Sequence, residues 1–589
     1  KRRDSSGQII ALVFPYCICY CLFQMNGAVH DLNLGRLAFT VVLLLIVVVA
    51  SGVLELGLEA QLVIAATRCA VQLTVLCAFL LEPMFAARNP TLIFVYLSII
   101  TVLAAREASA RLHYVYFGIR GHFVVAFLIG SGGVLAFAVA VVLQLQPWYD
   151  ARYLVPIAGM LLGNNLTATA LGADTFLTDL ADGTDRIYIR LCRGASWREA
   201  ILPSVKAAIS KALTPTLNSM AVMGLVFIPG MMTGQLLGGQ SPLEAGIYQI
   251  LIMYLVTVSG CLSATAVVTM GAYAVIDTPN HALRRERIKK PIQGPKRDVL
   301  LALIYGIVDL AFAAFDAARK FITARSADER HALLGVSSAA VAPDEESGNL
   351  DHKFVAKFTG TSSGQGPPLL EASDLVVGQT GLLISLQLAQ GDRVSITGAT
   401  GSGKTSLLRV LCRLNAPAGG VLRLDSIPST KVHAATWRAR VVFVPQDRPT
   451  LTGTPAEFFK LARSYRAQRK RALNFSDDAP INIASKWGLS SEKFHQQWFS
   501  LSGGEAQRAN LAIALALKPD VILLDEPTSA LDATTTASVE KDILAAGITL
   551  VLVTHSTEQA SRLCTSHVKL MPAVKSNTQP GQPLLIGGE

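Results

Sequence analysis

The chain has 589 residues, a formal net charge of +10, 51% hydrophobic and 16% charged residues, and a mean hydropathy of +0.43. The apolar share is above, and the charged share below, what soluble domains usually contain, so a purely soluble, disordered or collagen-like protein is excluded. The length allows two to four domains.

Charge is distributed unevenly along the chain. Residues 213–276 contain one formally charged residue, Glu244, whereas residues 281–297 contain seven Lys or Arg and one Glu. A basic protein often binds nucleic acid, but these basic residues flank apolar runs and form no Lys/Arg stripe with interleaved aromatics. We therefore expect no nucleic-acid partner and assign the basic segments to membrane orientation.

Repeated apolar runs in the first 280 residues predict membrane spans, because a bilayer core needs about 20 mostly apolar helical residues. The predicted spans are 8–25, 36–54, 60–81, 90–105, 122–145, 152–173, 213–236 and 247–275. The first follows Lys1, Arg2 and Arg3 and is also typical of a leader sequence. Seven or eight spans are therefore expected.

Basic residues also set the expected orientation. With the C-terminus inside, segments 1–7, 106–121, 182–211 and 281–297 hold 19 Lys or Arg, against three in the outer loops. Such residues favour the cytosolic side of a membrane. We expect a multi-pass protein of the lipid bilayer in which everything after residue 280 is cytosolic.

Polar side chains inside the spans are candidates for a substrate pathway, because they are costly in lipid. Arg68 and Gln72 lie one helical turn apart, Asn164 and Asn165 interrupt the sixth span, and Asn218 lies early in the seventh. For the asparagines the alternative is hydrogen bonding between helices. Arg68 needs a partner or water at that depth, which favours transport or gating.

Several motifs between residues 37 and 276 carry a family resemblance. They include Pro156-Ile-Ala-Gly-Met160, Pro215-Thr216 before Asn218, Pro229-Gly230-Met231-Met232 and Tyr248-Gln249-Ile250. Their order resembles the permease of the bacterial FetAB iron exporter and the plant aluminium-sensitivity (STAR-type) permeases. The resemblance implies export of a small solute: a metal ion such as iron by the bacterial relatives, a nucleotide sugar by the plant ones. Asn218 stands where the bacterial permease is expected to carry Asp, which counts against a metal ion.

A polar loop from Asp174 to Lys211 is expected inside the cell. Within it, residues 194–200 (GASWREA) resemble the short segment by which transporter permeases dock on their ATPase. A solvated amphipathic helix is the alternative.

Two segments join the halves of the chain. Residues 297–322, which include Asp309 and Asp316, predict an interfacial or cytosolic amphipathic helix. Residues 323–365 are rich in Ser, Ala, Gly, Asp, Glu and Pro, a composition typical of a flexible linker.

A phosphate-binding loop follows a predicted strand at 393–397 and precedes a helical stretch, as its chemistry requires. It consists of Gly398, Ala399, Thr400, Gly401, Ser402, Gly403, Lys404, Thr405 and Ser406. Backbone N–H groups and the helix N-terminus would cradle the phosphates of ATP, Lys404 would neutralise their charge, and Thr405 would give a hydroxyl to Mg²⁺.

An acidic pair ends the apolar strand 521–524. Asp525 is predicted to hold Mg²⁺, directly or through water. Glu526 is predicted to orient or deprotonate the attacking water.

Further motifs narrow the prediction from an NTPase to one family. Residues 501–508 (LSGGEAQR) resemble the signature of ABC ATPases, Gln446 their Q-loop, residues 529–532 their D-loop, and His555 their switch histidine. The resemblance places Gln446 beside Mg²⁺ and His555 in hydrolysis. At residues 375–377 (LVV), where the family usually stacks an aromatic on adenine, we expect weakened base selectivity.

The same resemblance implies that two ATPase domains meet head to tail. Each ATP would lie between the loop of Lys404 in one domain and Ser502, Gly503 and Gly504 of the other. One permease and one ATPase per chain then predict a half-transporter that pairs with a second copy, since two-fold pairing forms both sites at once.

The expected fold is an α-helical polytopic membrane domain followed by an α/β P-loop NTPase domain. The expected regions are a leader or extra helix (1–35), the permease (36–280), the basic segment, amphipathic helix and linker (281–365), the ABC ATPase (366–575) and a disordered tail (576–589). The expected function is ATP hydrolysis coupled to transport. The alternative is a membrane-anchored ABC ATPase that regulates a channel or transmits force, which the short outer loops and the polar residues in the spans disfavour.

Overall fold

The computed structural model describes residues 34–54, 56–81, 84–85, 89–277, 282–291, 355–357, 368–378 and 382–570. The predicted span 8–25, the predicted helix 297–322, most of the predicted linker and the predicted tail lie outside these residues. The chain divides into two compact units, residues 1–87 with 294–337 and residues 88–293 with 338–589.

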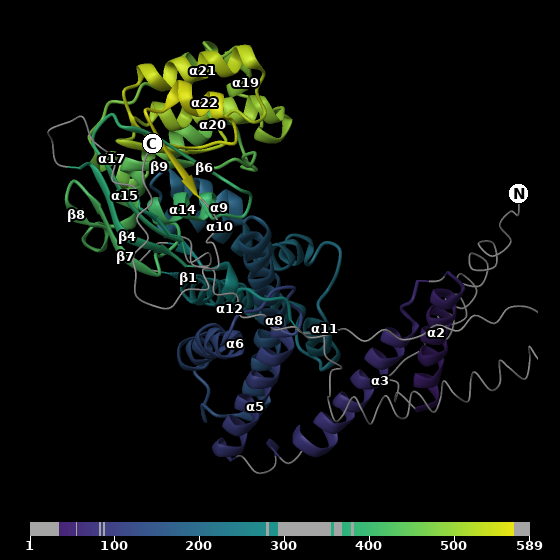
Figure 1. Cartoon of the computed structure of the whole chain (residues 1–589). Coiled ribbons are helices and arrows are strands. Elements are labelled where there is room, and N and C mark those ends of the chain that lie inside the picture. Colours follow the sequence, from purple (N-terminus) through teal and green to yellow (C-terminus); the bar gives the residue numbers. More distant parts are fainter. Residues whose placement is uncertain are drawn as a thin grey trace, which may run out of the picture. The chain divides into compact units, whose positions relative to one another are not determined.

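In the described part of the first unit, helices lie at the second and third predicted spans (Figure 1). They are α2 (Leu34–Val53) and α3 (Glu59–Val75), and α3 continues into the π-helical segment η1 (Leu76–Leu81). The hydroxyl of Ser51 donates to Glu59 Oε1 at 3.1 Å and accepts from the N–H of Leu58 at 3.3 Å. These bonds tie the end of α2 to the start of α3.

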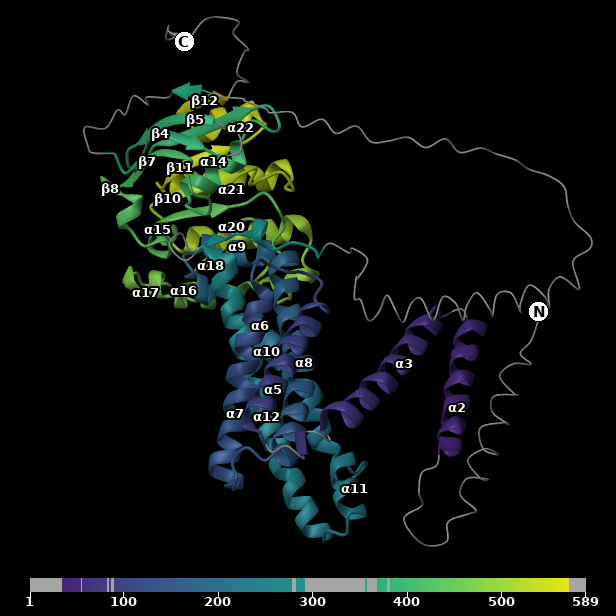
Figure 2. The same cartoon turned by 90° about the horizontal axis from the view of Figure 1, so that it is seen from below.

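The second unit begins with a helical bundle in which α8 packs against both α10 and α12 (Figure 2). Its elements are α5 (Pro90–Ser109), α6 (Ile119–Phe127), η2 (Leu128–Gly132), α7 (Gly133–Phe137), η3 (Ala138–Leu143), α8 (Ala151–Asp182), α9 (Thr184–Cys192), α10 (Trp197–Val222), α11 (Gly230–Leu237) and α12 (Pro242–Val275). Among the described residues, four helical stretches are long and apolar enough to cross a membrane: 90–109, 119–143, 151–182 and 242–275. They overlap the predicted spans 90–105, 122–145, 152–173 and 247–275, and the third continues to residue 182, into the segment predicted to be a polar loop.

The prediction of one continuous span over 213–236 is wrong, and the polar segment before it is helical rather than a loop. Helix α10 already begins at Trp197, because Ser196 and Glu199 form a capping box that stabilises its first turn. The helix ends at Val222, just before Gly224 with its φ of +79°. A left-handed residue interrupts helical hydrogen bonding, and Pro229 then caps the separate helix α11.

Small residues allow three helices of the bundle to meet. A Cβ at Gly172 of α8 would lie 3.1 Å from the Cβ of Ala212 in α10 and 3.8 Å from that of Ala264 in α12. In lipid, helices associate through such close packing of small residues. Gly163, on the same helix, has open space where a Cβ would lie.

The C-terminal domain is built on two five-stranded sheets. The first is parallel, in the order β12-β6-β11-β10-β9; the second has the order β3-β5-β4-β7-β8 and is antiparallel except where β3 pairs with β5. The strands are β3 (Val355–Lys357), β4 (Leu370–Val377), β5 (Leu382–Leu388), β6 (Arg393–Gly398), β7 (Gly419–Leu424), β8 (Ile427–Pro428), β9 (Val441–Val444), β10 (Val521–Asp525), β11 (Thr549–Val553) and β12 (Ser566–Leu570). A further short pair, β1 (Ile276–Asp277) and β2 (Ala282–Leu283), follows α12.

Helices cover the parallel sheet, and every residue of its central strands β10 and β11 is buried. The helices are α14 (Lys404–Leu411), α15 (Ala434–Arg440), α16 (Pro455–Ser464), α17 (Arg466–Lys470), α18 (Ala479–Ser485), α19 (Ser491–Phe494), α20 (Gly503–Ala516), α21 (Ala533–Ala545) and α22 (Thr557–Leu563). Helix α14 contacts β6, β9 and β10 of one sheet and β4 of the other. The predicted fold class, a helical membrane domain followed by an α/β NTPase domain, is confirmed.

Gly172→Val should destabilise the bundle by about 1–3 kcal/mol, the usual cost of overpacking a close contact, because the new side chain would collide with α10. Thermal unfolding of the full chain in detergent measures this. Gly163→Val is the matched control on the same helix and should unfold at nearly the parent temperature. Equal shifts for the two variants would contradict the packing described here.

Candidate active site

Four of the predicted motifs lie at the carboxyl ends of strands in the parallel sheet. The phosphate loop follows β6, Asp525 ends β10, Gln446 comes just after β9, and His555 comes just after β11. In a parallel sheet these ends share one edge, the edge at which α/β proteins bind ligands. Sheet order therefore gathers residues that are far apart in sequence.

The conformation of the phosphate loop depends on its glycines and on its lysine. Gly401 and Gly403 have φ angles of +82° and +92°, a conformation that favours glycine. The ammonium of Lys404 donates to the backbone oxygens of Gly398 and Ala399 at 2.8 and 3.0 Å. The hydroxyl of Ser402 is buried and has no hydrogen-bond partner among the described residues, so a polar group of the loop is available to a phosphate oxygen.

The two predicted magnesium ligands with the clearest geometry contact each other. The hydroxyl of Thr405 donates to Asp525 Oδ2 at 2.7 Å. Burial raises the pKa of the Asp525 carboxyl, and the hydrogen bond from Thr405 opposes that shift. A hydroxyl beside a carboxylate is the kind of hard oxygen donor set that Mg²⁺ prefers, so these residues fit the ion.

The three predicted catalytic residues form one cluster around Glu526. The side-chain amide of Gln446 donates to Glu526 Oε2 at 2.8 Å, and His555 Nε2 lies 3.2 Å from Glu526 Oε1. Glu526 has a φ of +46°, which costs about 1–2 kcal/mol for a residue with a side chain. Its backbone is held by bonds to Val553 at 2.9 Å and from the side chain of Gln507 at 3.2 Å. The catalytic roles of Gln446, Glu526 and His555 stay predictions. Their arrangement suits a carboxylate, that of Glu526, which orients a water molecule.

The signature residues form the start of α20. Ser502 caps this helix in a capping box with Glu505 and is exposed. A Cβ at Gly504 would lie 2.8 Å from the backbone oxygen of Ala530, so the glycine permits close contact with the predicted D-loop. Within the described part of the chain, no hydrogen bond joins Ser502 to the loop of Lys404.

The predicted docking segment does contact the C-terminal domain. At Gly194, whose φ is +88°, a Cβ would lie 2.9 Å from the Cβ of Ala439 in α15. Glu199 Oε1 accepts the N–H of Arg466 at 3.0 Å, where α17 begins. The contact thus uses both the tight turn and the first turn of α10.

Sequence reasoning missed the residues at the centre of this contact. Arg193 is fully buried, and its guanidinium donates to the backbone oxygen of Phe443 at 2.9 Å and to Asn510 Oδ1 at 2.6 Å. Gln468, also fully buried, donates its amide to the backbone oxygen of Arg193 at 3.0 Å. The one available signal was the position of Arg193 directly before the docking segment.

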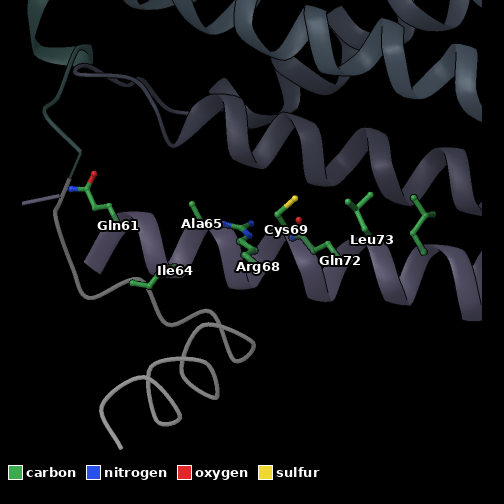
Figure 3. Close-up of a pocket in the computed structure, with 8 residues that line it drawn as sticks. Gln61, Ile64, Ala65, Arg68, Cys69, Gln72 and Leu73 are labelled. Carbon is green, nitrogen blue, oxygen red and sulfur yellow. The ribbon is translucent and has the colours of Figure 1, made fainter. Parts of the chain in front are cut away.

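The predicted pathway residues occupy separate surfaces. Arg68 and Gln72 line a hollow of about 640 Å³ along one face of α3, together with Gln61 and Cys69 (Figure 3). Asn164 of α8 is exposed, and its amide donates to the backbone of its own helix at Met160, at 2.9 Å.

Asn218 of α10 is exposed, like Asn164.

Asn165, the other asparagine of the sixth predicted span, is buried. Asn165 Nδ2 lies 2.6, 2.6 and 3.0 Å from the hydroxyls of Ser131, Ser259 and Ser263. For Asn165 the geometry favours the alternative of hydrogen bonding between helices, because it joins α8 to η2 and α12.

In the comparison with known proteins, two segments of the chain match two different families. Residues 34–276 match an uncharacterised protein family, UPF0014, and residues 383–529 match the ABC transporter ATPase family. The UPF0014 membrane protein slr1647 of Synechocystis is 35% identical over 36% of this chain and 82% of that protein. Protein ALUMINUM SENSITIVE 3 of Arabidopsis thaliana is 33% identical over 38% of this chain and 81% of that protein. The phosphate import ATP-binding protein PstB 1 of Vibrio vulnificus is 34% identical over 33% of this chain and 76% of that protein.

Glu526→Gln should lower ATP hydrolysis by about 100-fold or more, the lower end of what a positioned general base contributes, while ATP binding persists. Hydrolysis by the purified chain and equilibrium binding of a fluorescent ATP analogue test this. Glu558→Gln, on the exposed start of α22, is the control and should hydrolyse ATP normally. Unchanged hydrolysis in the first variant would refute the assigned role.

Proposed function

The chain belongs to the UPF0014 membrane-protein family through residues 34–276 and carries an ABC transporter ATPase domain, and on this basis we propose that it works as a half-transporter in which a second copy completes the machine. The transported solute is a metal ion such as iron or a nucleotide sugar, exported from the cytosol.

The observation that carries this proposal is the physical contact between the two domains of one chain. The turn between α9 and α10 packs against α15 and α17 and bonds to β9 and α20. A membrane bundle fixed to an ATPase in this way supports work on the membrane side driven by ATP hydrolysis.

The site residues fit ATP with Mg²⁺. The loop of residues 398–406 would hold the phosphates, Lys404, which now bonds backbone oxygens of this loop, would supply positive charge to them, and Thr405 with Asp525 and Gln446 would hold the ion. When bound, Mg²⁺ supplies positive charge to the phosphate oxygens. Glu526 would orient the attacking water and accept its proton, and Gln446 and His555 keep the carboxylate of Glu526 in place.

Pairing is supported by the placement of the signature. Ser502 and Gly503 are exposed at the start of α20, where the N–H groups of a helix N-terminus bind phosphate well. Because they form no hydrogen bond to the loop of Lys404 in the described chain, a second copy is the natural source of the partner loop. Two-fold pairing then builds two identical sites.

The exposed asparagines support a pathway, because they lie at similar depth in the bundle. Helices α8 and α10 pack as an antiparallel pair that meets at Gly172 and Ala212. Asn164 lies eight residues before Gly172 and Asn218 six residues after Ala212, or about 12 and 9 Å along the two axes. The two amides therefore lie at similar depth, and we assign them to solute passage. For Arg68 and Gln72 the same assignment rests separately on the hollow that they line along α3.

Pairing predicts that two inactive variants restore each other. Lys404→Ala removes the phosphate charge partner, and Ser502→Arg blocks the signature. In a mixed pair, the intact loop of one chain meets the intact signature of the other, so one working site returns. Each variant alone should be nearly inactive, and co-expressed, co-purified chains should regain measurable ATP hydrolysis. Failure of the mixture, with both variants folded, would contradict head-to-tail pairing.

Transport by inside-out vesicles identifies the solute. ATP-dependent uptake of ⁵⁵Fe or of labelled UDP-glucose is expected for the parent chain and should be lost in Glu526→Gln. Asn218→Asp is the informative variant, because a carboxylate there should favour a cation. Hydrolysis without uptake of either solute would support a regulatory or force-transmitting ATPase instead.

A further inference from the structure

We propose that Arg193 is the positioning residue that makes the membrane domain and the ATP site move together. The inference rests on the proposed function and goes further, because it assigns the coupling to one guanidinium outside the ATP site.

Arg193 belongs to the membrane domain but is enclosed by the ATPase domain. It follows the last residue of α9, Cys192, and both residues are essentially inaccessible to solvent. The guanidinium donates to Phe443 in β9 and to the side chain of Asn510 in α20. Its own backbone oxygen accepts a hydrogen bond from the side-chain amide of Gln468, the central residue of α17. One residue is thus held by three separate segments of the ATPase.

Both hydrogen-bond partners of the guanidinium lie within three residues of a side chain that contacts Glu526. Phe443 precedes Gln446 by three residues on β9 and its continuation. Asn510 lies one helical turn after Gln507, whose amide holds the backbone oxygen of Glu526. A displacement of Arg193 would therefore act on the two groups that place Glu526: Gln446, which bonds its carboxylate, and Gln507, which bonds its backbone oxygen.

Stability alone does not explain this arrangement. Among the described residues no Asp or Glu is bonded to Arg193, and its Nε is buried without a hydrogen-bond partner. Burial lowers the pKa of this guanidinium, which reflects the cost of keeping a charge there. Apolar residues often stabilise such positions at least as well as buried charges do. A costly cation at a domain contact is better explained by a requirement for fixed partners during movement.

Two cysteines allow the contact between the membrane domain and the ATPase domain to be followed by thiol labelling. Cys192 is sealed beneath the ATPase domain next to Arg193, whereas Cys261 lies partly exposed in α12 of the membrane bundle. N-ethylmaleimide labelling of Cys192 measures docking. The change in labelling of Cys261 on addition of ATP measures the response of the membrane domain and needs no knowledge of the solute.

The test uses the full chain in liposomes, with peptide-level mass spectrometry and ATP hydrolysis measured on the same samples. Arg193→Gln should keep hydrolysis within about threefold of the parent, while the ATP-dependent change at Cys261 falls at least fivefold. Arg193→Lys should recover part of the change, because an ammonium can reach one acceptor but not both. Asn510→Leu, which removes the acceptor at similar size, should resemble Arg193→Gln and serves if that variant does not fold.

Arg466→Gln is the matched control. Arg466 lies at the same contact, to which, among the described residues, it gives its backbone N–H and no side-chain hydrogen bond, so its variant should behave like the parent. A parent-like response of Cys261 in Arg193→Gln would overturn the inference, and so would a proportional loss of hydrolysis and response, which indicates a structural role alone. Absence of hydrolysis or of any ATP response in the parent chain would instead contradict the proposed function.

Discussion

The parallel order of β12, β6, β11, β10 and β9 is the constraint on which the ATP site depends. Parallel strands present all their carboxyl ends at one edge, so each motif that follows a strand reaches the same place. The buried central strands β10 and β11 fix that edge, since they are covered on both faces. Glu526 accepts a left-handed backbone at this edge, and the strain is held by bonds to Val553 and from Gln507.

The contact between the domains depends on both shape and charge. Gly194 and Ala439 approach so closely that a side chain at the glycine would collide, which sets the geometry of the turn. Arg193 is buried in this contact, and its guanidinium needs the hydrogen-bond acceptors that Phe443 and Asn510 provide. Its hydrogen bonds lose strength steeply when donors and acceptors separate, which is why we place the proposed coupling at this residue.

The asparagines discussed for the membrane bundle are of two kinds, buried and exposed. Asn165 is completely buried against three serine hydroxyls and holds helices together, as amides in lipid commonly do. Asn164 and Asn218 are exposed, which fits the solute passage proposed for them. Adjacent residues of one helix thus differ in role because successive side chains point about 100° apart around the axis.

The sequence by itself determined the domain classes, the phosphate loop, the acidic pair and the family of the ATPase, because these depend on local patterns of residues with fixed chemistry. Span positions followed from apolar length alone, and that criterion failed at 213–236, where a capping box and a left-handed glycine moved the helix. Only the tertiary structure decided that Gln446, Glu526 and His555 meet, that Asn165 rather than Asn164 is buried, and that Arg193 links the domains. These features depend on strand order, helix rotation and packing across more than 200 residues of chain, none of which leaves a periodic or local signal in the sequence.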